Sequence, residues 1–205
     1  MHGWRRKKRG LTNVFARGFK AWCENVAIQQ RRELGLRPTD PLDPWQLAKH
    51  LGIRVHTPSE IPGLDPDCLK TLLQEDADSW SAVTISAGSQ DVIILNSSHK
   101  GGRPASDLTH ELAHILLGHE PARIDVTADG TLMLSTYDKK QEEEANWLAG
   151  CLLLPRDALI VIQSQGVDSK LAARRYGISQ QMLQFRRNVT GVDYQLARAR
   201  GRNTA

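Results

Sequence analysis

The feature that most constrains this chain is the pentapeptide His110-Glu111-Leu112-Ala113-His114. Two imidazoles four residues apart lie on one face of an α-helix, about one turn apart, which is the separation that a tetrahedral zinc ion requires. Glu111 is rotated by about 100° from the first histidine, so its carboxylate is expected beside the metal and not on it. The pattern therefore predicts two metal ligands, His110 and His114, with Glu111 as the general base of a metal-assisted hydrolysis.

The residues around the pentapeptide favour a helix packed against a core. One stripe of a helix predicted over residues 105–118 contains Leu108, Leu112, Ile115 and Leu116. An apolar core offers imidazoles few polar partners, so two stacked histidines on such a helix indicate a bound ligand. The alternative is a pair of core histidines that are satisfied without a metal.

A third protein ligand must come from outside this helix. Some metallopeptidases have the longer motif HExxHxxGxxH, in which the last histidine is the third ligand. That motif is absent here, because Leu117 and Glu120 stand where its glycine and third histidine would be. Three acids open the next strongly helical stretch, and Glu142 shares its face with the small and apolar side chains expected to pack inward. Glu142 is therefore the preferred ligand. Glu143 and Glu144 are the alternatives, each otherwise explained as a solvated acid in the first helical turn.

Other residues near the predicted site are further candidates. Asn146 lies one turn after Glu142, from where its amide can hydrogen-bond a ligand. Tyr137 is a candidate for oxyanion support and is otherwise an ordinary half-buried tyrosine. Cys151 is a candidate inhibitory fourth ligand and is otherwise a small buried hydrophobic residue. His119 ends the first helix, where a histidine is favourable without a metal, so it is not counted among the ligands.

Apolar periodicity and turn residues predict an α+β organisation in which a small sheet precedes the metal-binding helix. Residues 92–95 are the candidate edge strand, along which an extended substrate would lie. The domains expected are a basic tail (1–10), a catalytic domain (11–155), a helical subdomain (156–202) and a short tail (203–205). The predicted helices are 11–34, 43–52, 68–73, 105–118, 138–154, 157–163, 169–176 and 179–188, and the predicted strands are 53–56, 82–85, 92–95, 124–126 and 132–134.

Cysteine content and hydropathy favour a soluble, cytoplasmic protein. The three cysteines are odd in number and form no CxxC pair, which is typical of a reducing compartment. No stretch approaches the roughly 18 apolar residues of a membrane span, and the N-terminus lacks the apolar run of a secretory signal.

Charge is distributed unevenly along the chain. Residues 1–37 contain ten Lys or Arg and two acids, residues 156–205 contain nine and three, and the segment between contains eight and eighteen. This distribution is expected if solvated basic helices flank an acidic catalytic core. It also fits a nucleic-acid surface centred on the N-terminal basic run, Arg5, Arg6, Lys7, Lys8 and Arg9.

Three segments together resemble the ImmA/IrrE metallopeptidases: residues 109–119, 142–149 and 152–155. The segments before them are similar as well, so the resemblance extends over roughly residues 20–190. It implies a zincin-like minimal metallopeptidase domain, with a small antiparallel sheet, one zinc ion per chain, and a third ligand at the acid that begins the ExxAN pattern, here Glu142. Two departures from the family pattern are Leu148, where an aromatic residue is usual, and Cys151.

The resemblance also implies a regulatory function. Members of this family cleave a DNA-binding repressor, often encoded nearby, when DNA damage or a phage or other mobile element is sensed. Single-stranded DNA is a candidate activator through the basic ends, and no membrane partner is expected. The alternative function is a DNA-binding regulator with a structural or vestigial zinc site. A structural zinc needs four protein ligands, whereas this sequence offers three and a general base.

The last helical segments resemble a helix-turn-helix, with residues 169–176 as its first helix and 179–188 as its second. One interpretation is that the second helix reads DNA. The other is that the segments pack on the catalytic domain and help to hold the substrate. Met182 and Leu183 favour the second interpretation, because base reading requires polar residues at such positions.

Overall fold

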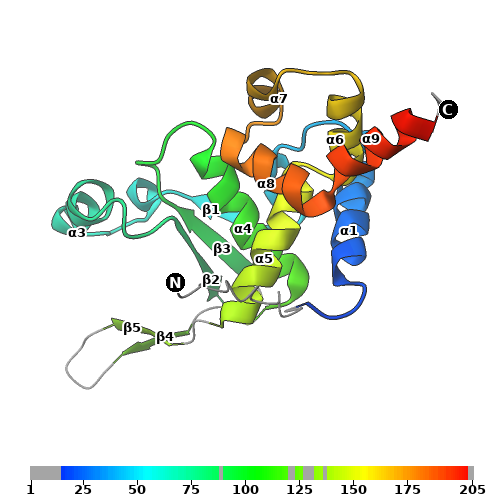
Figure 1. Ribbon diagram of the computed structural model, residues 1–205. Coiled ribbons are helices and arrows are strands. Elements are labelled where there is room, and N and C mark those ends of the chain that lie inside the picture. The colour runs from blue at the N-terminus through cyan, green and yellow to red at the C-terminus, as the bar shows by residue number, and fades with distance from the viewer. Residues whose placement is uncertain (1–14, 88–89, 120–122, 127–131, 136–137, 203–205) are drawn as a thin grey trace, which may run out of the picture.

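The computed structural model describes residues 15–87, 90–119, 123–126, 132–135 and 138–202 (Figure 1). A three-stranded sheet is packed against α4, α5 packs on α4, and α1 packs on α5. The helices are α1 (Phe19–Glu33), α2 (Pro44–His50), α3 (Pro66–Lys70), α4 (Arg103–Leu117), α5 (Lys139–Leu153), α6 (Arg156–Ser164), α7 (Ser169–Arg175), α8 (Gln180–Thr190) and α9 (Val192–Arg202), with single turns η1 (Pro58–Glu60) and η2 (Thr71–Glu75). The strands are β1 (Arg54–His56), β2 (Ala82–Ala87), β3 (Gln90–Leu95), β4 (Arg123–Val126) and β5 (Leu132–Ser135).

The three-stranded sheet has the order β1-β3-β2, so β3 is its central strand. β3 pairs in parallel with β1 and antiparallel with β2, which makes the sheet mixed and not antiparallel as expected. The prediction that residues 92–95 form the edge was therefore wrong. Ile93, Ile94 and Leu95 are consecutive and all buried, which is the pattern of a strand covered on both faces. β1 and β2 are the edges of this sheet.

Helix boundaries follow the capping residues. Asp43 accepts a hydrogen bond from the Trp45 backbone and Pro44 occupies the first turn, so α2 begins where it was predicted to. α1 instead begins at Phe19, because Gly18 adopts a left-handed conformation with φ of 89°. α1 buries Cys23 fully, whereas the neighbouring Trp22 is 43% exposed.

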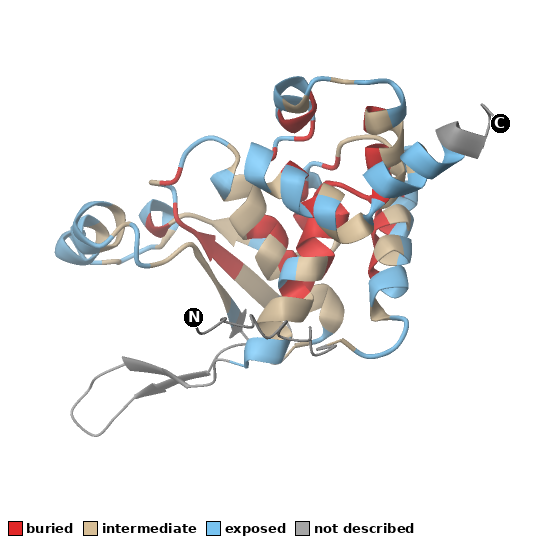
Figure 2. Ribbon diagram, viewed as in Figure 1, coloured by how far each residue is buried: buried red, intermediate tan, exposed pale blue. Residues whose placement is uncertain are grey.

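Buried residues form two clusters that share α5 (Figure 2). The first cluster joins α1, α2, β3, α4 and α5, and it includes Leu47, Ile93, Leu112 and Leu148. The second joins the end of α5 to the helices that follow it. Residues 148–154 are buried without interruption, because α5 is covered on all sides near its C-terminus.

Hydrogen bonds also connect segments that are distant in the sequence. Tyr176 donates to the Thr39 carbonyl at 2.6 Å, and the Arg31 guanidinium donates to the Leu152 carbonyl at 2.7 Å. The predicted boundary at residue 155 lies just beyond the helix that both clusters share, and it stays a prediction. The predicted tails, 1–10 and 203–205, lie outside the described residues.

No single helix of the described chain has the length and apolarity needed to cross a membrane. Only α5 and α6 taken together meet those criteria, and they are bent by 48°.

Candidate metal centre

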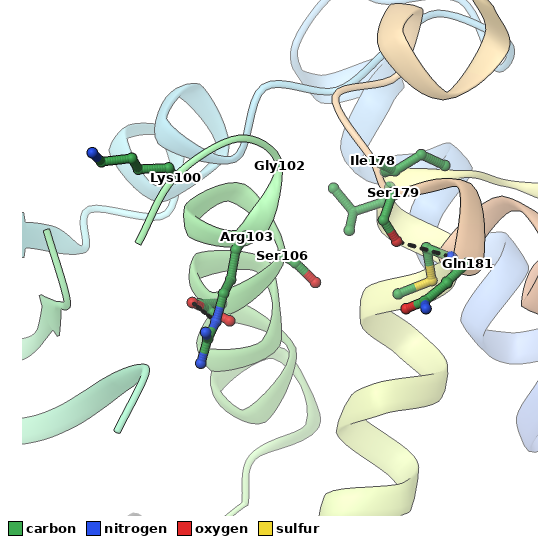
Figure 3. Close-up of a pocket in the computed structure, with 10 residues that line it drawn as sticks. Lys100, Gly102, Arg103, Ser106, Ile178, Ser179 and Gln181 are labelled. Atoms are coloured by element: carbon green, nitrogen blue, oxygen red, sulfur yellow. Dashed lines mark hydrogen bonds and ion pairs between the residues drawn. The ribbon is translucent and has the colours of Figure 1, made fainter. Parts of the chain in front are cut away.

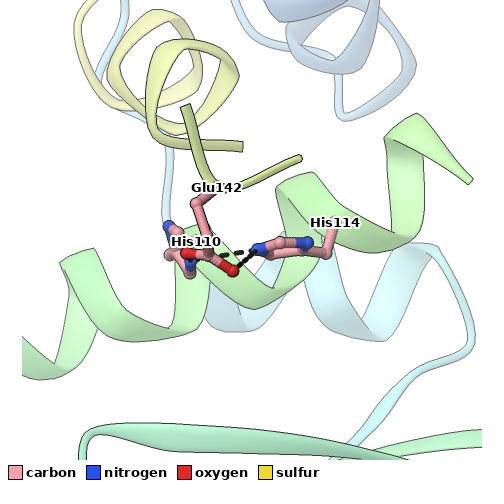
Figure 4. A group of neighbouring side chains, drawn as sticks. All are labelled: His110, His114 and Glu142. Atoms are coloured by element: carbon pink, nitrogen blue, oxygen red, sulfur yellow. Dashed lines mark hydrogen bonds and ion pairs between the residues drawn. The ribbon is translucent and has the colours of Figure 1, made fainter. Parts of the chain in front are cut away.

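The candidate metal centre forms where α5 crosses α4 (Figure 4). Buried alanines on both helices allow a close approach: Ala113 on α4, and Ala145 and Ala149 on α5. This packing brings Glu142, in the first turns of α5, over the two histidines of α4. Asp138 caps α5 by accepting from the Lys140 backbone, which fixes where the helix begins and therefore which of its acids faces α4.

The three candidate ligands have the mutual distances that zinc requires. His110 Nε2 lies 3.0 Å from His114 Nε2 and 3.2 Å from Glu142 Oε2, and His114 Nε2 lies 3.4 Å from Glu142 Oε1. Ligand atoms placed tetrahedrally at zinc distances of about 2.0–2.1 Å are roughly 3.3 Å apart. The donor set of two imidazoles and one carboxylate also suits zinc and leaves a fourth position open. These residues therefore fit a zinc ion.

Glu111 lies beside this group, as its position in the pentapeptide predicted. Thr84 of β2 donates its hydroxyl to Glu111 Oε2 at 2.6 Å, which fixes the carboxylate and leaves Oε1 for another partner. Burial raises the pKa of the Glu111 carboxyl, while the Thr84 hydrogen bond and the nearby His110 act in the opposite direction. A half-buried carboxylate with a raised pKa is suited to accepting a proton near neutral pH.

His114 is held as a neutral imidazole. Burial, with the neighbouring His110 and His119, lowers its pKa to about 4. A neutral ring is the form that binds a metal through an unprotonated nitrogen. Its other nitrogen, Nδ1, lies 2.9 Å from Nδ1 of His119, and His119 Nε2 lies 3.4 Å from Glu144 Oε2.

Three of these contacts were not predicted from the sequence: Thr84 with Glu111, His114 with His119, and His119 with Glu144. Thr84 precedes Glu111 by 27 residues, and no local pattern marks it. His119 and Glu144 were considered singly, as a helix-end histidine and as an alternative ligand. Glu144 faces His119, and among the described residues only Glu142 completes a ligand group with the two histidines.

The remaining candidates have different outcomes. Asn146 is exposed and forms no hydrogen bond with any described residue, so its role beside a ligand stays a prediction. The proposal of Cys151 as a fourth ligand was wrong. Its thiol is fully buried and faces Glu24 at 3.5 Å, and nine residues of helix place it about 13 Å along the axis from Glu142. Tyr137 and the N-terminal basic run lie outside the described residues.

A pocket of about 380 Å³ opens on another side of α4, where its N-terminus meets the N-terminus of α8 (Figure 3). Arg103 and Ser106 line it from α4, and Ser179 and Gln181 line it from the α8 side. The two segments approach so closely that a Cβ on Gly102 would lie 2.8 Å from the Gly177 carbonyl oxygen. The turn before α8 is thus in close contact with the residue that precedes α4.

A helix bearing two imidazoles and a half-buried carboxylate, crossed by a second helix that adds a third ligand, is the arrangement of a metallopeptidase-like domain. The family described as peptidase M78, IrrE N-terminal-like domain, matches residues 48–188, which is more than half of the chain. The chain belongs to this family, and the predicted resemblance is confirmed. No curated protein matches the chain significantly.

Proposed function

We propose that this chain is a zinc-dependent endopeptidase that cleaves a protein substrate. The observation that carries the proposal is the spacing of 3.0–3.4 Å among His110, His114 and Glu142, with Glu111 beside them and not among them. A closed structural site would need a fourth protein ligand. In the described part of the chain, no fourth His, Cys, Asp or Glu joins this group.

Zinc and Glu111 have separate roles in the proposed hydrolysis. Zinc, when bound, supplies a Lewis acid that polarises a carbonyl and lowers the pKa of water. Glu111 accepts the proton of the attacking water at Oε1, because Oε2 is held by Thr84. The carboxyl then returns this proton to the amine that leaves.

The substrate is proposed to bind as an extended strand along β2. Ser81 and Asn96 form the pair next to Ala82 and Leu95 in the β2–β3 register. The Asn96 backbone N–H donates to the Ser81 carbonyl at 2.9 Å, so this pair is hydrogen-bonded. Hydrogen-bonded and free pairs alternate in antiparallel strands, so the backbone groups of Ala82, Thr84 and Ser86 are directed away from β3. They are available to pair with a peptide directly beside Glu111.

A DNA-binding repressor is the proposed substrate, with DNA damage or a mobile element as the proposed signal, as the family resemblance implies. Substrate holding is the role we assign to the C-terminal helices. Base reading requires polar side chains on the outer face of α8, whereas Leu183 is 2% exposed and Met182 lines the pocket beside α4. Activation by single-stranded DNA through Arg5, Arg6, Lys7, Lys8 and Arg9 is part of the proposal.

The test is cleavage of the helix-turn-helix repressors encoded beside this gene, incubated with zinc-loaded protein. Glu111→Gln is expected to keep zinc and substrate binding but to lower the cleavage rate on the order of a thousandfold, since an amide cannot accept the proton. Glu143→Gln is the matched control, because the only ion pair of Glu143 among the described residues is with Lys139, at 3.9 Å. Unchanged cleavage by Glu111→Gln would contradict the mechanism.

A further inference from the structure

The carboxyl end of α4 folds back on the metal centre through a glycine. Gly118 has φ of 66°, and the His119 backbone N–H bonds to the His114 carbonyl at 3.0 Å. This pattern closes a helix with a left-handed residue and returns the chain to its last turn. His119 is thereby brought back against His114 itself, with ring centroids 4.9 Å apart.

Protons along this contact can be assigned in order. A metal bound at His114 Nε2 requires that nitrogen to be unprotonated, so the ring carries its proton on Nδ1. That proton is donated to His119 Nδ1, 2.9 Å away, which must then be the acceptor. The proton of His119 is left on Nε2, which faces Glu144 Oε2 at 3.4 Å. Each tautomer is fixed by the one before it.

The burial of these groups favours a role at the metal centre. The side chains of His119 and Glu144 are 8% and 15% exposed, whereas Glu143, the neighbouring acid on α5, is 35% exposed. An acid in the first turns of a helix is explained by the helix dipole when it is solvated. Glu144 is largely withdrawn from water and faces an imidazole, and its other oxygen lies 3.8 Å from Lys140.

We propose that His119 and Glu144 are positioning residues that orient His114 and increase its basicity toward zinc. Outer hydrogen-bond partners of a metal-binding histidine fix its ring and strengthen its bond to the metal. Here the partner is a second imidazole, and the carboxylate behind it makes that imidazole a better acceptor. The inference rests on the proposed zinc centre, and it assigns a function to two residues outside the ligand set.

The experiment measures zinc affinity of the metal-stripped protein by competition with a chromophoric chelator, independently of any substrate. His119→Ala is expected to weaken zinc binding by about 10–100-fold, and Glu144→Gln by a smaller factor. Glu143→Gln is the matched control and is expected to bind zinc as the wild type does. The visible spectrum of the cobalt-substituted protein is expected to change in His119→Ala and not in Glu143→Gln.

A conservative variant separates positioning from folding. In His119→Asn the amide oxygen can still accept from His114 Nδ1, so most of the affinity lost in His119→Ala is expected to return. Adding Glu144→Gln to His119→Ala is expected to cause little further loss, because the two residues act in series. The thermal midpoints of the metal-stripped variants check that each one folds.

The outcomes are distinguishable from failure of the zinc centre. One zinc per chain in wild type, with unchanged affinity in His119→Ala, would overturn the positioning role and leave the zinc centre intact. Equal losses in Glu144→Gln and Glu143→Gln, or losses that simply add in the double variant, would also overturn it. Absence of zinc binding by the wild-type protein would overturn the zinc centre and the positioning role together.

Discussion

Each residue of the candidate metal centre is held by partners of its own. Both ring nitrogens of His114 are engaged, one with the ligand group and one with His119. Glu111 is held by a single hydroxyl from β2. Glu142 is the most exposed of the three candidate ligands, at 32%, and its position depends on where α5 begins. Substitutions at these residues should therefore have separable effects on metal binding and on catalysis.

Removal of any one ligand should abolish or greatly weaken zinc binding. We expect His110→Ala, His114→Ala and Glu142→Ala each to lose the metal, because the described part of the chain offers only three protein ligands at this site. Elemental analysis after dialysis measures the zinc content, with Glu143→Ala as the control that retains it. Full occupancy in Glu142→Ala combined with loss in Glu143→Ala would disprove the assignment of the third ligand.

Loss of the Thr84 hydroxyl should lower the rate of catalysis without affecting the metal. In Thr84→Val the strand keeps its shape, but Glu111 loses the hydrogen bond to Oε2. We expect kcat to fall on the order of tenfold with zinc affinity unchanged, and Thr84→Ser to restore most of the rate. Steady-state kinetics on a cleaved substrate tests this, and equal rates for the Val and Ser variants would contradict it.

At the scale of elements, β2 lies at an open edge of its sheet, whereas α5 is enclosed near its C-terminus. β2 is an edge of its sheet, next to α4, and leaves alternate backbone groups unpaired with β3. α5 is enclosed near its C-terminus by the rest of the chain. An open sheet edge beside the proposed general base is suited to recruiting a peptide strand, whereas the enclosed end of α5 anchors the helix that carries Glu142.

A proline on the free edge of β2 should weaken substrate binding specifically. Ser86→Pro removes a backbone N–H that is directed away from β3, and an edge strand tolerates proline at such a position. We expect KM to rise while zinc content and the circular dichroism spectrum stay unchanged. Ile85→Pro is the contrasting variant, because it removes an N–H that is directed toward β3, and it should destabilise the sheet. An unchanged KM in Ser86→Pro would exclude pairing of the substrate at this position.

At the scale of the whole molecule, an ion pair between a buried arginine and a half-buried glutamate connects the first helix to the C-terminal helices. Arg186 of α8 is fully buried and donates to Glu24 of α1 at 2.5 Å and to the Leu154 carbonyl at 3.0 Å. Glu24 also accepts from the Arg156 backbone at 2.9 Å. Gly150 of α5 leaves the space for this arginine, since a Cβ there would lie 3.0 Å from Arg186 Cδ.

Breaking this pair should destabilise the fold strongly. Arg186→Ala leaves the Glu24 carboxylate without its counter-charge, so we expect a loss of about 3–5 kcal/mol in the free energy of unfolding. Arg187→Ala is the matched control: Arg187 pairs with Asp193, which is 45% exposed, and the expected loss is at most about 1 kcal/mol. Urea denaturation measures both, and similar losses in the two variants would contradict the role of this pair.

Much of the candidate site could be predicted because it is encoded locally. The helical repeat alone places His110 and His114 on one face and Glu111 beside them. Glu142 could be predicted as the third ligand from the apolar face of its own helix and from the family resemblance. Thr84 and the pairing of His119 with Glu144 could not be predicted, because they join segments whose relative positions depend on packing between elements.

The sequence by itself determined most helices and hairpins, their order, and the residues that can bind a metal, because turn residues, caps and apolar periodicity act over a few residues. The tertiary structure decided which strand is central. β3 was predicted as an edge, yet it pairs on both sides because β1, from much earlier in the chain, lies parallel to it. Tertiary structure also decided the environment of Cys151, which contacts α1 and not the metal centre. Contacts between distant segments follow from how whole faces bury their apolar surface, and no local pattern specifies them.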